Sequence, residues 1–220
     1  MLRRFLTQIF VFQFIAMVCS LFFVSEAKAF GLGLTLGKTF KGFASYEYKQ
    51  VDNFPHNFDN AVDYNSSDII FGVALDTNLS KYHVYNYRLE IQRSKITLTD
   101  SNSLKTNMDK WTMDHNFGFQ VYQDPLVRIW IGPQIRISYA KGDSDIEQTG
   151  LGLSPLIGMN LNPDSIISPS LTIGFRNEAL YGSYKEPVNS DGNIRKDRKE
   201  FVSYSRGIFI NMSLFFRIDE

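Results

Sequence analysis

The chain has 220 residues, of which 44% are hydrophobic and 15% aromatic, and its basic and acidic residues are equal in number, so it carries no net charge. This length and composition favour one folded domain and give no sign of disorder. A neutral chain lacks the basic field that nucleic-acid binding needs, and one cysteine, Cys19, excludes a disulfide framework.

The first 29 residues are interpreted as an export leader. Arg3-Arg4 precede a nearly apolar run from Phe5 to Val24, and Ala27-Lys28-Ala29 has the small-x-small pattern of a cleavage site. We expect cleavage after Ala29, which leaves residues 30–220 as one domain with a net charge of −2 and no cysteine. An uncleaved N-terminal anchor helix is the alternative.

Alternation of apolar and polar residues dominates the rest of the chain. It recurs in eight segments, at residues 32–48, 68–76, 85–92, 111–121, 127–139, 151–161, 171–181 and 202–218. A period of two predicts β-strands, and no comparable helical period appears.

The connections between these segments alternate in length. They are short at 76–83, 123–126 and 162–165, and longer and polar at 50–67, 99–110, 140–149 and 184–200. We therefore predict an all-β fold, an eight-stranded antiparallel up-and-down meander. An even number of strands lets such a meander close into a barrel without an exposed edge.

Two kinds of barrel fit this alternation, a soluble periplasmic barrel with an apolar lumen or a transmembrane barrel with a polar one. The polar face carries many glycines, among them Gly33, Gly72 and Gly158, which make room in the narrow lumen that eight strands leave. The apolar face is large and uniform, which suits lipid. The aromatic residues expected at the two membrane interfaces are Tyr46, Tyr48, Tyr85, Tyr87, Trp111, Tyr139, Tyr181 and Tyr204.

The chain combines a leader, eight alternating segments, short turns, long loops and an apolar last segment. Together these features resemble the small OmpA/OmpX-type outer-membrane barrels of Gram-negative bacteria. The resemblance covers residues 30–220 and is architectural. Within the last segment Ser205, Gly207, Ile210 and Met212 resemble the signal by which barrel-assembly machinery recognises a terminal strand. The chain departs from the family in ending on Asp219-Glu220, where an aromatic residue is usual.

The resemblance implies a monomer in the cell outer membrane, in contact with outer-membrane lipid, lipopolysaccharide and the assembly machinery. Lys38 and Arg206 fall on the apolar face. We expect Arg206 near lipid phosphates at the loop-side interface. Snorkelling of Lys38, or a bulge at Gly37, would accommodate the other cation.

Charges of both signs lie on the predicted lumen face, namely Glu47, Arg88, Glu90, Asp114, Arg128, Arg136, Arg176 and Glu178. Buried charges must be paired, so we expect ion pairs across the strands that plug the lumen. A gated path through the same residues is the alternative. Phe209 and Phe215 are large for this face and are expected to fill space opposite lumen glycines.

The three histidines, His56, His83 and His115, share no metal-ligand spacing and have no evident serine partner. Asp143–Glu147 lacks the frame of a calcium loop and is interpreted as a solvated acidic loop. The basic cluster Arg195–Lys199 is a candidate for contact with lipopolysaccharide phosphates. We expect no catalytic residue, metal or cofactor.

The sequence thus predicts a non-enzymatic outer-membrane barrel with a structural or surface-interaction role through its extracellular loops. A narrow channel or a conduit for hydrophobic ligands is the alternative. A lipid A-modifying enzyme that uses His115 on the outer wall comes third.

Overall fold

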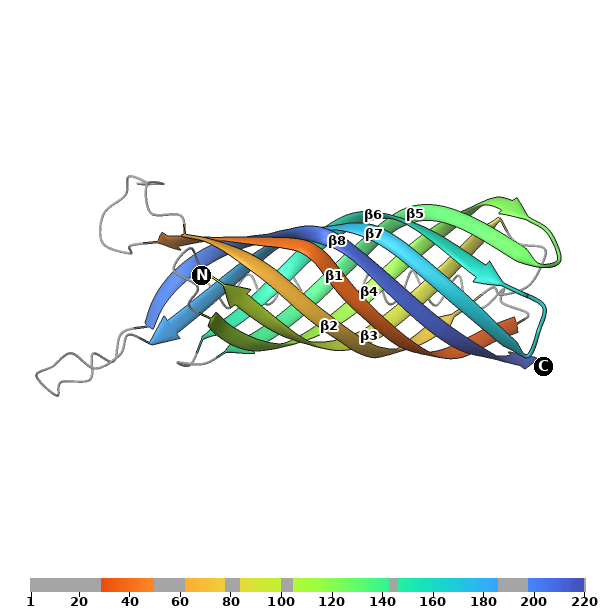
Figure 1. Ribbon diagram of the computed structural model, residues 1–220, viewed down its shortest axis with the longest axis horizontal. Coiled ribbons are helices and arrows are strands. Elements are labelled where there is room, and N and C mark those ends of the chain that lie inside the picture. The colour runs from red at the N-terminus through yellow and green to blue at the C-terminus, as the bar shows by residue number, and fades with distance from the viewer. Residues whose placement is uncertain are drawn as a thin grey trace, which may run out of the picture.

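The computed structural model describes residues 29–49, 62–77, 84–99, 105–142, 146–185 and 198–219. They form the strands β1 (Ala29–Lys49), β2 (Val62–Asp76), β3 (Tyr85–Thr99), β4 (Lys105–Gln123), β5 (Val127–Gly142), β6 (Glu147–Leu161), β7 (Ile167–Lys185) and β8 (Arg198–Asp219). Each strand pairs antiparallel with its neighbours, and β8 pairs with β1, which closes the barrel (Figure 1). The predicted all-β fold with eight antiparallel strands is confirmed. Apart from Ala29, the expected leader lies outside the described residues.

Several strands extend further toward the long connections than the apolar pattern predicts. β2 begins at Val62 and β4 at Lys105, so each starts six residues before the segment expected from sequence. The backbone hydrogen-bond ladder continues there, with pairs such as Tyr46 with Val62 and Thr99 with Lys105. A ladder needs no apolar face, so hydrophobic alternation underestimates strand length at this end. Across the described ranges, no helix has the length and apolar character to cross a membrane.

The short turns lie at the opposite end, beside the C-terminus (Figure 1). Asn162 has a φ of 46°, a left-handed conformation that Asn tolerates better than most residues. Its amide donates to the carbonyl of Leu126 at 2.7 Å, and the amide of Ser165 donates to the Asn162 carbonyl at 2.9 Å. The first bond ties the β6–β7 turn to the β4–β5 turn, and the second closes the β6–β7 turn itself.

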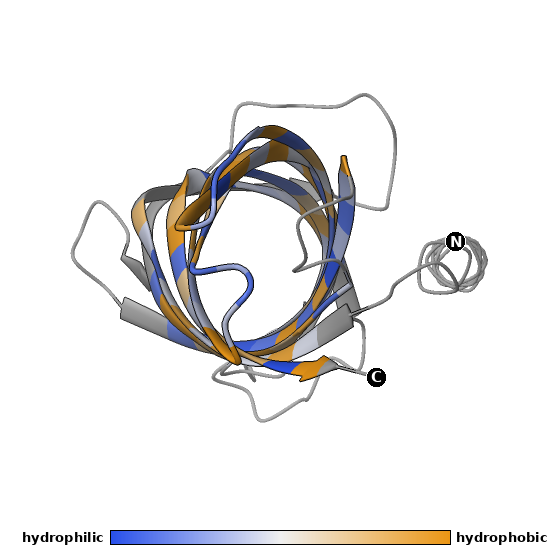
Figure 2. Cartoon of the chain, turned by 90° about the vertical axis from the view of Figure 1, so that its right-hand side faces the viewer, coloured by the Kyte–Doolittle hydropathy of each residue, from blue (hydrophilic) through white to orange (hydrophobic). Residues whose placement is uncertain are grey.

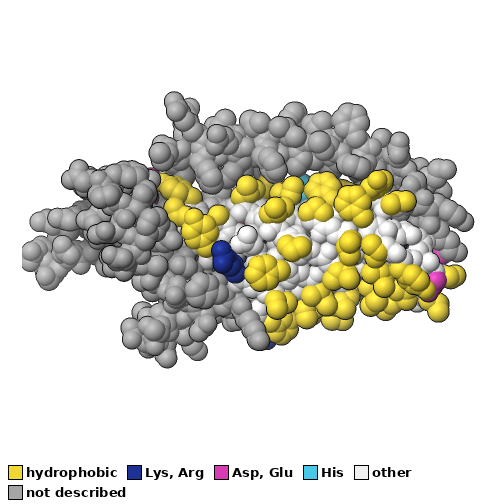
Figure 3. Space-filling model, turned by 90° about the horizontal axis from the view of Figure 1, so that it is seen from above, with side chains coloured by type: hydrophobic (Ala, Val, Ile, Leu, Met, Phe, Trp, Pro, Cys, Tyr) yellow, Lys and Arg dark blue, Asp and Glu magenta, His cyan; other side chains and the backbone are white. Residues whose placement is uncertain are grey.

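The outer wall is apolar and the lumen is polar. Leu34, Phe71, Leu153 and Met212, on four different strands, are each 62–64% exposed, while alternate residues of the same strands are buried. Viewed from above, yellow apolar side chains are spread along the described surface (Figure 3), and the ring of strands encloses the inner face (Figure 2). Soluble monomers rarely expose apolar surface on this scale.

β1 does not keep a single phase along its length. Its register with both neighbours shifts between Thr39 and Phe43, the signature of a β-bulge. Beyond this bulge Tyr46 pairs with Ser203 and Tyr48 with Phe201, two residues on the lumen face of β8, while Glu47 pairs with Val202.

A slip of one residue exchanges the two faces of a strand. The side chains of Tyr46, Glu47 and Tyr48 lie outside the described residues, so the faces expected for them stay predictions. The bulge follows Lys38 and does not fall at Gly37, so Lys38 keeps its exposed outward position.

Candidate functional site

The lumen gathers seven of the eight charged residues expected there. Arg88, Glu90, Asp114, Arg128 and Arg136 are 0% exposed, Glu178 is 2% exposed and Arg176 is 4% exposed. The side chain of Glu47 lies outside the described set. Each of the seven lies in a stretch of its strand without a register shift, so the alternation holds there; the shift in β4 comes later, between Gln120 and Tyr122.

Two of the ion pairs join directly opposed residues of neighbouring strands. Arg136 on β5 donates from Nε and Nη2 to the two carboxylate oxygens of Asp114 on β4, both at 2.6 Å. Arg88 on β3 donates from Nε and Nη2 to Oδ2 of Asp76 on β2, at 2.9 and 2.7 Å. The Arg136 contact, with two nitrogens on two oxygens, is the bidentate and strong form of an arginine–carboxylate contact.

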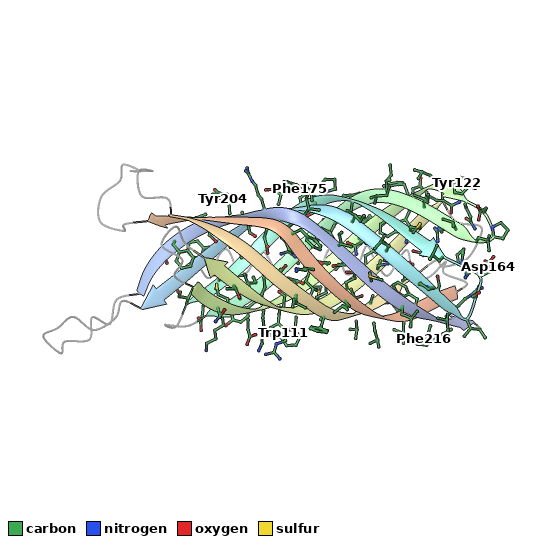
Figure 4. All side chains as sticks on the ribbon, viewed as in Figure 1. Trp111, Tyr122, Asp164, Phe175, Tyr204 and Phe216 are labelled. Atoms are coloured by element: carbon green, nitrogen blue, oxygen red, sulfur yellow. The ribbon has the colours of Figure 1, made fainter. Side chains whose placement is uncertain are left out.

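Other contacts cross the lumen between strands that are not neighbours. Arg176 on β7 donates to Asp68 on β2 at 2.7 Å, and Lys110 on β4 pairs with Glu178 on β7. Arg88 also reaches Thr172 on β7 at 3.2 Å and Asn160 on β6 at 3.1 Å. These contacts tie opposite walls together, and their side chains are buried. Figure 4 shows that side chains project into the barrel as well as outward from it.

Glu90 and Asp68 connect these pairs to the remaining strands. Glu90 accepts from Asn211 on β8 at 3.3 Å and lies 3.9 Å from Nη1 of Arg88. Asp68 accepts from the backbone amide of Thr39 at 3.0 Å, beside the β1 bulge. The Asp68 carboxylate therefore binds both Arg176 across the lumen and the backbone of the bulged strand β1.

Three network members, Asp68, Asp76 and Lys110, were missed as site residues. Both aspartates belong to the polar phase of the second predicted segment, so their signal was present. Lys110 had been assigned to a connection, yet it continues the inward phase of Thr112 and Asp114 and is 1% exposed. Extending the inward alternation of β4 from Thr112 back to Lys110 would have predicted this residue.

Aromatic rings occupy the space between the charges. Trp130, Phe209 and Phe215 are each fully buried on the inner face. The Arg88 guanidinium carbon lies 5.1 Å from the ring centroid of Trp130 and 4.5 Å from that of Phe215. Cation–π attraction adds to the ion pair at such distances.

Glycines opposite the rings provide the room. A Cβ added to Gly33 would lie 2.7 Å from Phe215, and one added to Gly174 would lie 2.5 Å from Phe209. The expectation that these two phenylalanines fill space opposite lumen glycines is confirmed. Trp130 was missed, although its place between two outward isoleucines puts it in the inward phase.

An apolar cluster lies beyond the charges toward the long-loop end. Met108, Ala140 and Phe201 are 1–4% exposed and pack together, with Ile96 and Ile146 against them. Met108 lies two residues before Lys110 in β4, on the side of the long connections. The charged contacts are therefore covered on this side by apolar packing.

The aromatics predicted for the interfaces divide into two groups. Trp111, Tyr139, Tyr204 and Tyr85 are 41–54% exposed on the outer wall, and Tyr181 is half-buried. Tyr87 departs from the expectation, since it is 3% exposed. Its hydroxyl bonds Nδ1 of His115 at 2.7 Å, and its ring packs on Phe117 with centroids 5.4 Å apart.

His115 itself pairs with Leu89 across β3 and β4 and is 3% exposed. Arg206 is exposed on the outer face of β8. Ser205, Gly207, Ile210 and Met212 all lie in β8, which pairs with both β7 and β1. Among the residues with described positions, no group of three or more His, Cys, Asp or Glu could hold a metal ion.

Comparison with known proteins identifies the fold. No protein-family model and no curated protein matches the chain. The structure is similar to the outer membrane protein OprG from Pseudomonas aeruginosa, with a TM-score of 0.56, 8% identity, and coverage of 85% of this chain and 96% of that one.

Two weaker similarities carry no argument of their own. Neisserial surface protein A has a TM-score of 0.37, with 13% identity over 82% of this chain and 95% of that one. The outer membrane protease OmpT from Escherichia coli has a TM-score of 0.41, with 10% identity over 87% and 98%. With its closed ring of eight strands and its apolar outer wall, the chain has the fold of the small outer-membrane β-barrels.

Proposed function

We propose that this protein is a non-catalytic barrel of the outer membrane, with a lumen closed by packed charges and rings. It acts as a structural component of the membrane or through the loops at its long-connection end. The observation that carries the closed lumen is the set of ion pairs between opposite walls, Lys110 with Glu178 and Arg176 with Asp68, all at most 5% exposed.

The burial of the charged side chains and the balance of their charges both favour a closed lumen over an open path for ions. Among the described side chains, the buried cations of the inner face are Arg88, Lys110, Arg128, Arg136 and Arg176, and the buried anions, equal in number, are Asp68, Asp76, Glu90, Asp114 and Glu178. An ion entering such a lumen would have to separate paired groups. Removing one partner from a buried pair costs about 3–5 kcal/mol.

Planar-bilayer recording of the refolded full-length protein tests this proposal. We expect the wild type to give no single-channel steps, and the double substitution Trp130→Ala with Phe215→Ala to give steps by removing two rings. Ile131→Ala is the matched control, since Ile131 lies on the outer face of the same strand. Heat-modifiable gel mobility reports whether each variant is folded.

Wild-type steps that change when Arg88→Ala or Glu90→Gln is introduced would overturn the plug. They would favour the alternative, a narrow channel along the same charged face. Single-channel steps of the wild type that neither substitution changes would indicate a conducting path elsewhere in the barrel.

Catalysis on the outer wall is tested separately through His115. Its Nδ1 is bonded to Tyr87, an arrangement that positions the ring in a structural pair. We expect lipid A from cells with His115→Ala to have the same mass spectrum as lipid A from wild-type cells. A difference that a deletion strain reproduces would make the protein a lipid A-modifying enzyme.

A further inference from the structure

Two lysines form a cationic row on the outer wall. Lys38 on β1 and Lys95 on β3 both pair with Ile69 on β2, so the three residues lie in one row across the strands. All three are exposed. Neighbouring strands are about 4.8 Å apart, so the two lysine backbones are about 10 Å apart.

This row carries a net positive charge. Asp109 on β4 pairs with Lys95 at the end of this row and accepts from the exposed Arg93 at 3.2 Å, so Lys38, Lys95 and Arg93 outnumber this one carboxylate. Lys38 lies with its Nζ 5.4 Å from the ring of Phe40, a contact that leaves its charge in place. Cations on the lipid-facing side of a barrel are costly within the hydrocarbon and become tolerable near the headgroups.

An apolar groove lies on the same three strands, on the turn side of the lysine row. It has a volume of about 410 Å³. Two cross-strand rows line it, Leu32–Leu75–Leu89 and Leu34–Val73–Ile91. Leu34 is 64% exposed and Val73 is 53% exposed, so the groove opens onto the wall.

The spacing joins the two features into one surface. Lys38, Ile69 and Lys95 each lie four residues from Leu34, Val73 and Ile91 on the same strand, or about 13 Å along it. Lysine stems can lie along apolar wall while their ammonium groups stay polar. On the turn side of the lysine row, these strands have one further outward cation among the described side chains, Arg93, which lies between the row and the groove. The cations therefore gather at one end of the surface and the apolar groove lies at the other.

We propose that the β1–β3 wall binds the lipid A part of lipopolysaccharide, with its phosphates at Lys38 and Lys95 and an acyl chain in the groove. Charge complementarity selects this occupant, because two cations above an apolar groove match a phosphorylated lipid that carries several chains. The inference rests on the proposed placement of the barrel in the outer membrane with its long loops outward. It is independent of whether the lumen conducts.

Titration of the detergent-solubilised full-length protein with fluorescent bis-phosphorylated lipid A tests this site. We expect Lys38→Gln with Lys95→Gln to weaken binding at least tenfold and Val73→Phe to weaken it severalfold by filling the groove. Lys141→Gln, an exposed lysine on β5, and Ile173→Phe on the outer face of β7 are matched controls expected within twofold of wild type. Lys38→Arg with Lys95→Arg should retain binding.

Several outcomes would overturn the proposal. Unchanged binding in the double glutamine variant, or an equal loss in the Lys141→Gln control, would show non-specific attraction. Equal binding of lipid A without phosphates would remove the role of the lysines. Displacement of lipid A by inorganic phosphate alone would indicate a simple anion site. Heat-modifiable mobility confirms that each variant is folded, and bilayer recording of the same proteins keeps this result separate from that on the closed lumen.

Discussion

Gly158 shows how single residues decide the packing of the lumen. It faces Trp130 in the paired position on β5, and a Cβ at Gly158 would lie 2.1 Å from two carbons of the indole. No real Cβ contact is that short, so the ring or the backbone would have to move. Excess volume in a packed interior typically costs about 1–3 kcal/mol.

We therefore expect Gly158→Ala to lower the free energy of unfolding by about 1–3 kcal/mol. Denaturant unfolding in lipid vesicles measures the change. In a Trp130→Leu background the same substitution should cost much less, because the atoms that collide are absent. Equal costs in both backgrounds would show that Trp130 is not what excludes the side chain.

Asp124 gives the β4–β5 turn its dependence on pH. Its carboxylate accepts from the Tyr122 hydroxyl at 2.8 Å and from the amides of Leu126 and Val127 at 2.7 and 2.8 Å. These bonds, that from Tyr122 first, hold the pKa of Asp124 below its ordinary value of 3.8. A lowered folded-state pKa stabilises the fold above the unfolded pKa, and this contribution is lost as the pH falls through the folded value.

We expect the unfolding free energy of the wild type to fall more steeply than that of Asp124→Asn as the pH is lowered below about 4. The asparagine keeps an acceptor oxygen without a titrating charge. Urea unfolding at a series of pH values gives the comparison. Parallel curves for the two proteins would mean that this carboxylate does not contribute.

At the scale of the element, the bulge in β1 shifts the register of the strand against both of its neighbours. The carboxylate of Asp68 bonds the amide of Thr39 at its edge, and the register with β8 resumes at Phe43 with the phase exchanged. The apolar alternation of Leu32, Leu34 and Leu36 gives no warning of this change. A bulge inserts backbone without altering composition, so hydrophobic pattern alone does not locate it.

Single cysteines test the exchanged phase, since Cys19 is the chain's one cysteine and can be replaced by serine. We expect Glu47→Cys to react with a bulky polymer-linked maleimide faster than Tyr46→Cys, because position 47 pairs with the outer residue Val202 and position 46 with the lumen residue Ser203. Modification is followed by gel shift on intact cells. The opposite order of rates would restore a single phase through the strand.

At the scale of the whole molecule, closure and the apolar wall act together. Eight strands with β8 against β1 leave no free edge, so every backbone ladder is satisfied within the wall, which a lipid environment requires. The interior carries the charges, and the outer wall carries the leucines, isoleucines and phenylalanines that face lipid.

We expect the protein to fractionate with outer membranes and to migrate differently on gels before and after heating, because a closed barrel resists detergent until it is heated. Cell fractionation followed by electrophoresis of heated and unheated samples checks both. The Gly158→Ala variant should unfold at a lower heating temperature than the wild type. Recovery in the soluble periplasmic fraction would contradict the membrane placement.

The amino-acid sequence by itself determined the strand number, the up-and-down order and the identity of the two faces, because a period of two is written into each segment. It also indicated the fit of Phe209 and Phe215 against glycines, since side-chain size is a local property. Only the tertiary structure decided that Arg176 meets Asp68 and that Lys110 meets Glu178. Those partners lie on strands far apart in the chain, and the stagger of strands around a closed barrel sets which residues share a level. The same closure fixed the register of β1 beyond its bulge, where the strand pairs with β8 shifted by one residue.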